Sequence, residues 1–212
     1  MDSDSHFWLN WYMQATIAAA AVCSLLFVLL GAFRRFRNAS RLRLQLADDI
    51  GILTGCCLTK NNGEPVETRE RWYHLKVSNR TRAPLVTQVQ CYITQVDEIN
   101  PAGKLQNLWS GEVPVHWQGQ CTAPAYRDIG HPVNIDLFSI VEDYSLRIHP
   151  VTKPRGLECE WRRGAHLLVT IQARGIEAES KPVRIQIDWD GQWDDSDAQM
   201  RRHVVVQALG KR

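Results

Sequence analysis

Two patterns of hydrophobic and polar positions divide the chain. Residues 7–33 contain no Asp, Glu, Lys, Arg or His, whereas the later sequence consists largely of short segments in which apolar and polar residues alternate. The 19 residues from Ala15 to Phe33 would extend about 28 Å as a helix, close to the roughly 30 Å of a bilayer's hydrocarbon core. A helix also satisfies its own backbone groups without water. The first pattern therefore predicts a transmembrane helix over residues 7–33.

The residues around this run indicate a retained anchor. Trp8, Trp11 and Tyr12 lie near its first end, and such aromatic rings favour the level of the lipid headgroups. A cleaved signal peptide has a basic start and a shorter apolar run, whereas residues 1–6 carry two aspartates and no Lys or Arg. A buried helix of a soluble protein fits neither the length nor the flanks. We therefore expect a short extracytoplasmic tail over residues 1–6 and an uncleaved helix that contacts the lipid bilayer.

A basic cluster follows the apolar run and predicts its orientation. By the positive-inside rule, a cluster on this side places the N-terminus outside and the C-terminal part in the cytoplasm, at the inner (plasma) membrane. The same cations would attract anionic lipid, but a topology signal is the simpler interpretation. The cluster consists of Arg34, Arg35, Arg37, Arg41 and Arg43.

Residues 69–193 show the second pattern, which is typical of an antiparallel β-sandwich or barrel. The clearest pair is 166–173 with 183–189, because both segments alternate strictly. We also expect 105–109 to pair with 113–117, with Pro114 at an edge or bulge. The remaining expected strands are 72–77, 85–93, 132–140 and 145–148.

The segments on either side of this domain have weaker patterns. We expect a basic juxtamembrane segment and connector over residues 34–68, in which the alternation of Leu42, Leu44 and Leu46 allows one further strand. Residues 194–212 form a C-terminal tail. It begins with Asp-Asp-Ser, a sequence that favours the start of a short helix.

Charge and cysteine content restrict the partners. Five of the 25 Lys and Arg residues lie in the basic cluster, and two of the 23 Asp and Glu residues lie in the N-terminal tail. The net charge of the sequence from Leu44 onward is therefore close to zero. Nucleic-acid-binding domains usually carry a basic excess, and we therefore expect no nucleic-acid partner.

Five of the six cysteines lie outside the apolar run, without a Cys-x-x-Cys pair. This odd, scattered set fits a reducing compartment and predicts no zinc site.

No catalytic or cofactor-binding motif is present. The seven histidines are dispersed, and the sequence lacks a Gly-x-Ser-x-Gly elbow, a His-Glu-x-x-His motif and a phosphate-binding glycine loop. The densest group of carboxylates lies between Asp188 and Asp197, but its Gly191 falls at position 4 rather than position 6 of a calcium-binding loop. A solvated Asp-Gly turn is the favoured interpretation. We therefore expect no enzyme activity, metal or cofactor.

Tryptophans offer the one candidate ligand surface. Most of the six between residues 72 and 193 should pack in the core, because aromatic side chains dominate the packing of sandwiches. Trp109 and Trp117 lie beside expected loops and are the weak candidates for ligand binding.

Two segments carry a resemblance to a known family. The sequence 72–79 followed by 89–93 resembles the opening hairpin of Ig-like domains in uncharacterised bacterial membrane-anchored proteins, and 168–171 through 187–193 is similar to their closing strands. The likeness covers about 125 residues and consists of strand-packing motifs. It implies an all-β fold, an immunoglobulin-like antiparallel β-sandwich after the single N-terminal transmembrane helix, and it implies no functional residues.

Two functions fit these expectations. In the first, a single-pass membrane protein presents an Ig-like domain to the cytoplasm for contact with another protein. In the alternative, the domain is an exported envelope module that recognises sugar or another ligand through exposed tryptophans. The side of the membrane on which the C-terminus lies would separate the two.

Overall fold

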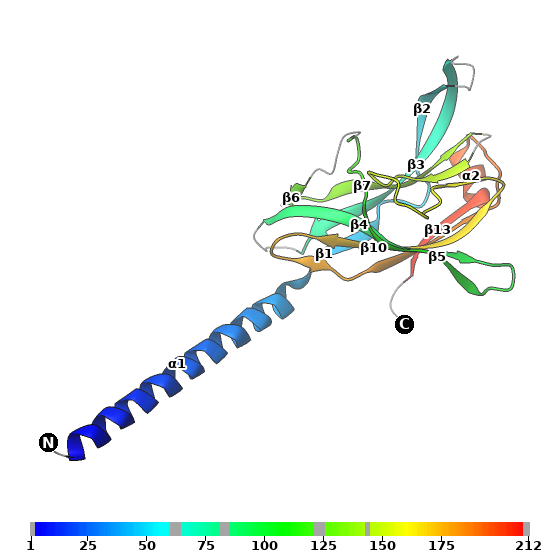
Figure 1. Cartoon of the computed structure of the whole chain (residues 1–212). Helices are drawn as coiled ribbons and strands as arrows, with labels where there is room; N and C mark the ends of the chain where they lie inside the picture. Colours follow the sequence, from blue (N-terminus) through cyan, green and yellow to red (C-terminus); the bar gives the residue numbers. More distant parts are fainter. Residues whose placement is uncertain (1–2, 60–64, 81–84, 121–125, 143–144, 210–212) are drawn as a thin grey trace. The chain divides into compact units, whose positions relative to one another are not determined.

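The computed structural model describes residues 3–59, 65–80, 85–120, 126–142 and 145–209, and it divides into two units (Figure 1). The first unit, residues 1–39, contains the helix α1 (Ser3–Asn38) of 36 residues. Its sequence is rich in Ala and Leu, which favour helix, and the Ser24 hydroxyl donates to the carbonyl of Ala20 at 2.9 Å. Among the residues that the structure describes, no helix meets the length and apolarity needed to cross a membrane.

In the second unit, residues 40–212, the described regular structure consists of strands apart from one short helix. This confirms the all-β class predicted from the alternating pattern. The strands are β1 (Ala39–Leu46), β2 (Ile52–Thr59), β3 (Pro65–Asn79), β4 (Val86–Ile99), β5 (Leu105–Pro114), β6 (Arg127–Ile129), β7 (Val133–Val141), β8 (Ser145–Ile148), β9 (Glu160–Trp161), β10 (Ala165–Arg174), β11 (Glu179–Ser180), β12 (Val183–Trp189) and β13 (Val204–Leu209). One short helix, α2 (Asp197–His203), precedes β13.

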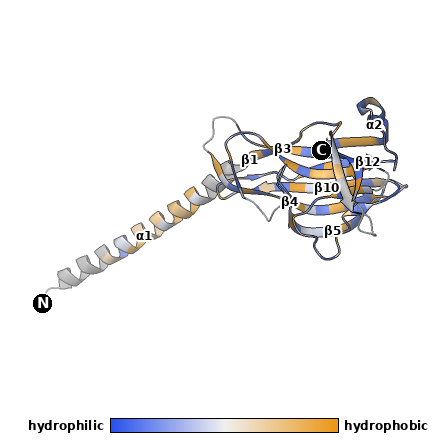
Figure 2. Ribbon diagram, turned by 90° about the horizontal axis from the view of Figure 1, so that it is seen from above, coloured by the Kyte–Doolittle hydropathy of each residue, from blue (hydrophilic) through white to orange (hydrophobic). Residues whose placement is uncertain are grey.

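These strands form one curled sheet that encloses a core. One half has the order β13-β12-β10-β4-β5, and the other half has the order β1-β3-β7-β8-β9. The short strand β11 lies between β10 and β1 and joins the halves, while β2 pairs with β3 and β6 pairs with β4. Figure 2 shows hydrophobic and hydrophilic residues alternating along β4 and β10.

The core consists of the inward-facing positions of both halves. On β10 these are Leu167, Val169, Ile171 and Ala173, all 0 % exposed. On β3 the side chains of Tyr73, Leu75 and Val77 are buried in the same cluster. Removing apolar surface from water stabilises the fold by roughly 25 cal/mol per Å², so the recurrence of apolar side chains at every second position determines which face turns inward.

Several expected elements are confirmed. The pair 166–173 with 183–189 is the antiparallel pair β10–β12, in register from Ala165 opposite Trp189 to Ile171 opposite Val183. Pro114 ends β5, whose only strand partner in the described chain is β4, as expected for an edge. The short helix also forms, with Ser196 at its N-cap, and the β-branched residues after it turn to strand in β13.

The expected opening hairpin is wrong. The segments 72–79 and 89–93 lie on β3 and β4, but β3 pairs with β1, β2 and β7, whereas β4 pairs with β5, β6 and β10. The two strands thus belong to opposite halves. Strand β3 pairs with β7 and β4 pairs with β10, and local spacing does not reveal these distant partners.

The expected pair 105–109 with 113–117 is also wrong. Residues 105–114 form the single strand β5, which pairs along β4 with two shifts of register. Such irregularities break the alternation and imitate a turn in the sequence. Beyond β5 the chain crosses to the other half, where Trp117 forms an isolated bridge with Ile135.

The structure also differs from the expected connector over residues 34–68. This range contains the end of α1, all of β1 and β2, and the start of β3. The alternation of leucines in β1 does mark a strand, which pairs with β3 from Leu42 opposite Asn79 to Leu46 opposite Leu75.

Candidate functional site

A two-stranded arm extends from the sheet at β2 and the first part of β3. Strand β3 pairs with β7 only from Glu70 to Val77, whereas its pairing with β2 runs from Pro65 to Trp72. From Pro65 to Arg69, therefore, β2 is the only strand that pairs with β3 in the described chain. Figure 1 shows this arm standing apart from the other strands of its unit.

Strand β2 has no charged residue, and its outer edge has no strand partner among the described residues. Ile52 is 44 % exposed and the next residue, Leu53, is 40 % exposed. Neighbouring residues of a strand point to opposite faces, so both faces of the arm present apolar surface. An edge of this kind offers unpaired backbone N–H and C=O groups to another strand.

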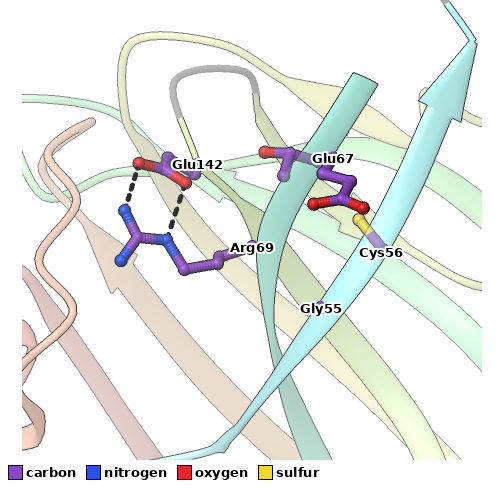
Figure 3. Close-up of a pocket in the computed structure, with 6 residues that line it drawn as sticks. Gly55, Cys56, Glu67, Arg69 and Glu142 are labelled. Carbon is purple, nitrogen blue, oxygen red and sulfur yellow. Dashed lines mark hydrogen bonds and ion pairs between the residues drawn. The ribbon is translucent and has the colours of Figure 1, made fainter. Parts of the chain in front are cut away.

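A cavity of about 520 Å³ lies at the base of the arm (Figure 3). The Arg69 guanidinium binds Glu142 with two hydrogen bonds, Nε to Oε2 at 3.0 Å and Nη2 to Oε1 at 2.7 Å, and it also pairs with Asp195. The hydrogen bond from Arg69 holds the pKa of the Glu142 carboxyl below its ordinary value, and that from Glu142 raises the pKa of Arg69. The residues lining the cavity are Gly55, Cys56, Glu67, Thr68, Arg69 and Glu142.

The arm is fixed to the domain by a buried arginine. The Arg71 side chain is 0 % exposed and donates from Nη1 to Asp197 Oδ1 at 2.6 Å. It also donates to the carbonyl of Asp195 at 3.0 Å and to that of Ile50 at 3.3 Å. One guanidinium thereby holds together β3, the turn before β2 and the start of α2. A buried charge requires such a set of partners.

A Ser–His–Glu contact on β3 and β7 has the residue types of a hydrolytic site. The Ser139 hydroxyl lies 2.6 Å from Glu70 Oε1 and 2.6 Å from His149 Nε2. The hydroxyl donates its one proton to Glu70, so the imidazole Nε2–H donates to the hydroxyl oxygen. The proton of Ser139 thus points away from the base, and Ser139 is 0 % exposed. This arrangement supplies no accessible nucleophile.

His149 is held neutral by its surroundings. Its ring stacks on Trp72 with 4.4 Å between the centroids. Burial, with a smaller contribution from the nearby cations, lowers the pKa of His149 to about 4, although the charge of Asp136 acts in the opposite direction. Asp136 itself lies 3.2 Å from Nε2 of the buried His74. The outer face of β3 and β7 therefore carries a structural polar cluster.

The carboxylates between Asp188 and Asp197 bind protein groups. Asp188 faces His166 at 3.1 Å and Asp190 faces His203 at 2.9 Å, while Asp195 and Asp197 bind the arginines of β3. Gly191 has φ +86°, as the expected Asp-Gly turn requires. Across the described residues, no group of His, Cys, Asp and Glu is arranged to hold a metal ion.

The two candidate tryptophans lie in different environments. Trp117 is 1 % exposed, with the guanidinium of Arg127 at 5.7 Å from its ring centroid, so its ring offers no surface to a ligand. Trp109 on β5 is partly buried and packs against the core. The structure thus places one candidate in the interior and the other at the edge, and does not bring them together as a binding surface.

The predicted basic cluster is divided between the two units. Arg34, Arg35 and Arg37 belong to α1, and their side chains lie outside the described part of the structure. Arg41 and Arg43 belong to β1, where Arg43 is exposed opposite Ser78 of β3.

No family model matches the chain, and no curated protein or solved structure is significantly similar to it. The open edge of β2 was missed in the sequence, where Ile52–Thr59 read as a connector. Its one signal was a run of eight residues without charge or proline.

Proposed function

We propose that the chain is a single-pass membrane protein whose immunoglobulin-like β-sandwich lies in the cytoplasm and binds protein. In this role the domain performs no catalysis. The observation that carries the proposal is the arm of β2 and β3, because an open uncharged strand is a surface that another polypeptide can extend.

The anchor rests on the sequence. The 27 residues from Phe7 to Phe33 contain no charged side chain, and the helix α1 includes all 27. Five arginines follow this run within ten positions. The arginines support a cytoplasmic location for the C-terminal unit. The near neutrality of that unit fits a protein partner better than a nucleic acid.

The immunoglobulin-like character is supported by the two halves of the sheet. Each half is antiparallel, and apolar residues of both halves meet in one core. A non-enzymatic role is supported by the burial of Ser139. It is also supported by the ion pairs that carboxylates between Asp188 and Asp197 form with side chains of the domain.

Extraction of membranes with alkaline carbonate tests the anchor. We expect the full chain to stay with the membrane pellet. Leu26→Arg, which places a charge in the middle of the apolar run, should increase the released fraction because a cation at the bilayer centre costs about 2.5–3.5 kcal/mol. Leu105→Arg on the exposed part of β5 is the matched control and should behave as the parent chain. Release of the parent chain would refute the anchor.

A further inference from the structure

A second groove lies where the two halves of the sheet meet, between β1 and the residues that connect β11 with β12. It has a volume of about 310 Å³ and is lined by part of β1, by Arg80 after β3 and by residues between Ser180 and Val183. Strand β11 has two residues and β1 has eight, so β11 covers only part of this edge of β1. This β1–β12 groove is therefore bordered by an incompletely paired strand edge.

The backbone of β1 supplies hydrogen-bond donors at the groove. The N–H of Arg80 donates to the carbonyl of Arg41 at 2.9 Å. Hydrogen-bonded positions alternate along an antiparallel pair, so the odd-numbered residues of β1 bond β3 and the even-numbered residues direct their backbone groups to the opposite edge. Leu42 and Leu44 are even-numbered residues with buried side chains, and both line the groove. Their backbone groups thus form part of its wall.

Three cations border the β1–β12 groove, and no carboxylate lines it in the described part of the chain. Arg43, Arg80 and Lys181 are exposed, and none of them forms an ion pair with another described residue. They belong to β1, to the end of β3 and to the β11–β12 connection, which only the fold brings together. In the cavity at the base of the arm, by contrast, Arg69 already binds two carboxylates.

The carboxylates that precede Lys181 in the sequence are held by other groups. Glu177 accepts hydrogen bonds from the N–H and the hydroxyl of Thr87 at 2.9 and 2.6 Å, and Glu179 accepts one from Gln172 at 3.4 Å. Neither carboxylate lines the groove. The groove therefore joins exposed cations to backbone donors without an anion among the described residues, which is the composition of an anion-binding site.

We propose that the β1–β12 groove binds the phosphate group of an anionic phospholipid headgroup. The planar guanidinium groups of Arg43 and Arg80 match phosphate oxygens with paired donors, and the ammonium of Lys181 adds a third positive charge. Backbone N–H groups of β1 donate to the same oxygens. The inference rests on the proposed anchor and adds to it a lipid contact made by the β-rich unit.

The position of β1 in the chain favours a lipid over a dissolved anion. Strand β1 begins at Ala39, directly after α1 ends at Asn38, and Arg43 follows the uncharged run by ten residues. The five residues from Asn38 to Arg43 span at most about 18 Å when fully extended. An anchored chain therefore holds the groove within reach of headgroup phosphates, whose effective concentration is raised by the tether.

Hydrogen exchange of the full chain in lipid nanodiscs tests this site. One disc contains phosphatidylcholine alone, and the other contains phosphatidylcholine with phosphatidylglycerol. The amide exchange of residues 40–47 is followed by mass spectrometry. Exchange should be roughly tenfold slower in the second disc once the lipid is at about ten times its dissociation constant, because bound phosphate accepts from N–H groups of β1. Inorganic phosphate at millimolar concentration, added to the first disc, should not reproduce this slowing.

Charge variants separate the site from general attraction to an anionic surface. Lys181→Gln should weaken the binding about fivefold, since a cation near an anionic surface contributes about 1 kcal/mol, and Lys181→Arg should retain it. The triple variant Arg43→Gln, Arg80→Gln, Lys181→Gln should lose the slowing. A control removes the same charge from three exposed residues that do not line the groove, and it should behave as the parent chain: Lys104→Gln, Lys153→Gln, Arg155→Gln. Unchanged exchange of β10 in every variant shows that the domain is folded.

Three results would overturn the lipid site. They are equal exchange in the two discs, equal loss of slowing in the two triple variants, and slowing by inorganic phosphate without slowing by phosphatidylglycerol. Purification of the discs reports separately on the anchor. A chain that stays with the discs without slowed exchange refutes only the lipid site, and a chain that stays with neither disc refutes the anchor and the lipid site together.

Discussion

At the scale of single residues, the domain depends on buried charged side chains and on the groups that pair with them. Arg71 is the clearest, because the Nη1 and Nη2 donors of its wholly buried guanidinium keep their partners only while Asp197 and the surrounding carbonyls remain in place. The carboxylate of Asp197 is itself 66 % exposed, so the pair lies at the boundary of the core. Its contribution is therefore smaller than that of a fully buried ion pair.

Removing Asp197 should destabilise the domain. We expect Asp197→Ala to lower the free energy of unfolding by about 1–3 kcal/mol, because it removes a hydrogen bond to a charged group and leaves Arg71 buried without its anion. Asp49→Ala is the matched control. It removes an exposed pair with Arg201 and should cost less than about 1 kcal/mol. Urea denaturation of the detergent-solubilised chain, followed by tryptophan fluorescence, measures both, and equal losses would contradict this role of Arg71.

His149 should make stability depend on pH. Its pKa is about 4 in the folded domain and 6.5 in the unfolded chain, so the unfolded chain binds the extra proton first as the pH falls. Stability is therefore expected to decrease from about pH 6.5 to pH 4 and to be unaffected by this residue above pH 7. At pH 5 its share of the loss is about 2 kcal/mol.

The variant His149→Gln isolates this effect. Glutamine also donates a hydrogen bond to the Ser139 oxygen but does not titrate. Its free energy of unfolding should decrease less than that of the parent between pH 7 and pH 5. Identical slopes for the two chains over this range would show that His149 is not held neutral by burial.

At the scale of elements, alternation predicted those strands that have one face in the core. The pair β10–β12 was predicted because every second residue of both strands is buried. The arm was missed for the opposite reason, because Ile52 and Leu53 of β2 are exposed at successive positions and no alternation marks the strand. The Ser139–His149–Glu70 contact could not be predicted, because it arises from the pairing of β3 with β7, two strands far apart in the sequence.

The turn between β10 and β11 should be intolerant of a side chain. A Cβ at Gly175 would lie 2.8 Å from the carbonyl oxygen of Thr87 and 2.9 Å from side-chain carbons of Val86 and Val89. Because backbone atoms would have to move, Gly175→Ala should cost about 1–3 kcal/mol of stability. Gly55→Ala has open space around its Cβ and should change stability by less than about 0.5 kcal/mol. Thermal unfolding compares the two, and a neutral Gly175→Ala would contradict the close approach of this turn to β4.

At the scale of the whole molecule, the proposals combine an anchored helix with a domain that binds through the edge of β2. The helix α1 and the β-rich unit are separate compact units. The anchor is proposed from the long uncharged run and the arginines after it, both of which are patterns local in sequence. The open edge of β2 was not predictable, because it depends on which strand the fold leaves without a second partner.

We propose above all that the C-terminal unit lies in the cytoplasm behind a single anchor. The most direct measurement places a cysteine at the C-terminus, as Arg212→Cys, and labels intact and permeabilised cells with a membrane-impermeant maleimide, with mass spectrometry of the C-terminal peptide as readout. We expect labelling of this peptide only after permeabilisation, with the chain in the membrane fraction. Labelling in cells with an intact plasma membrane would place the unit outside and contradict the account.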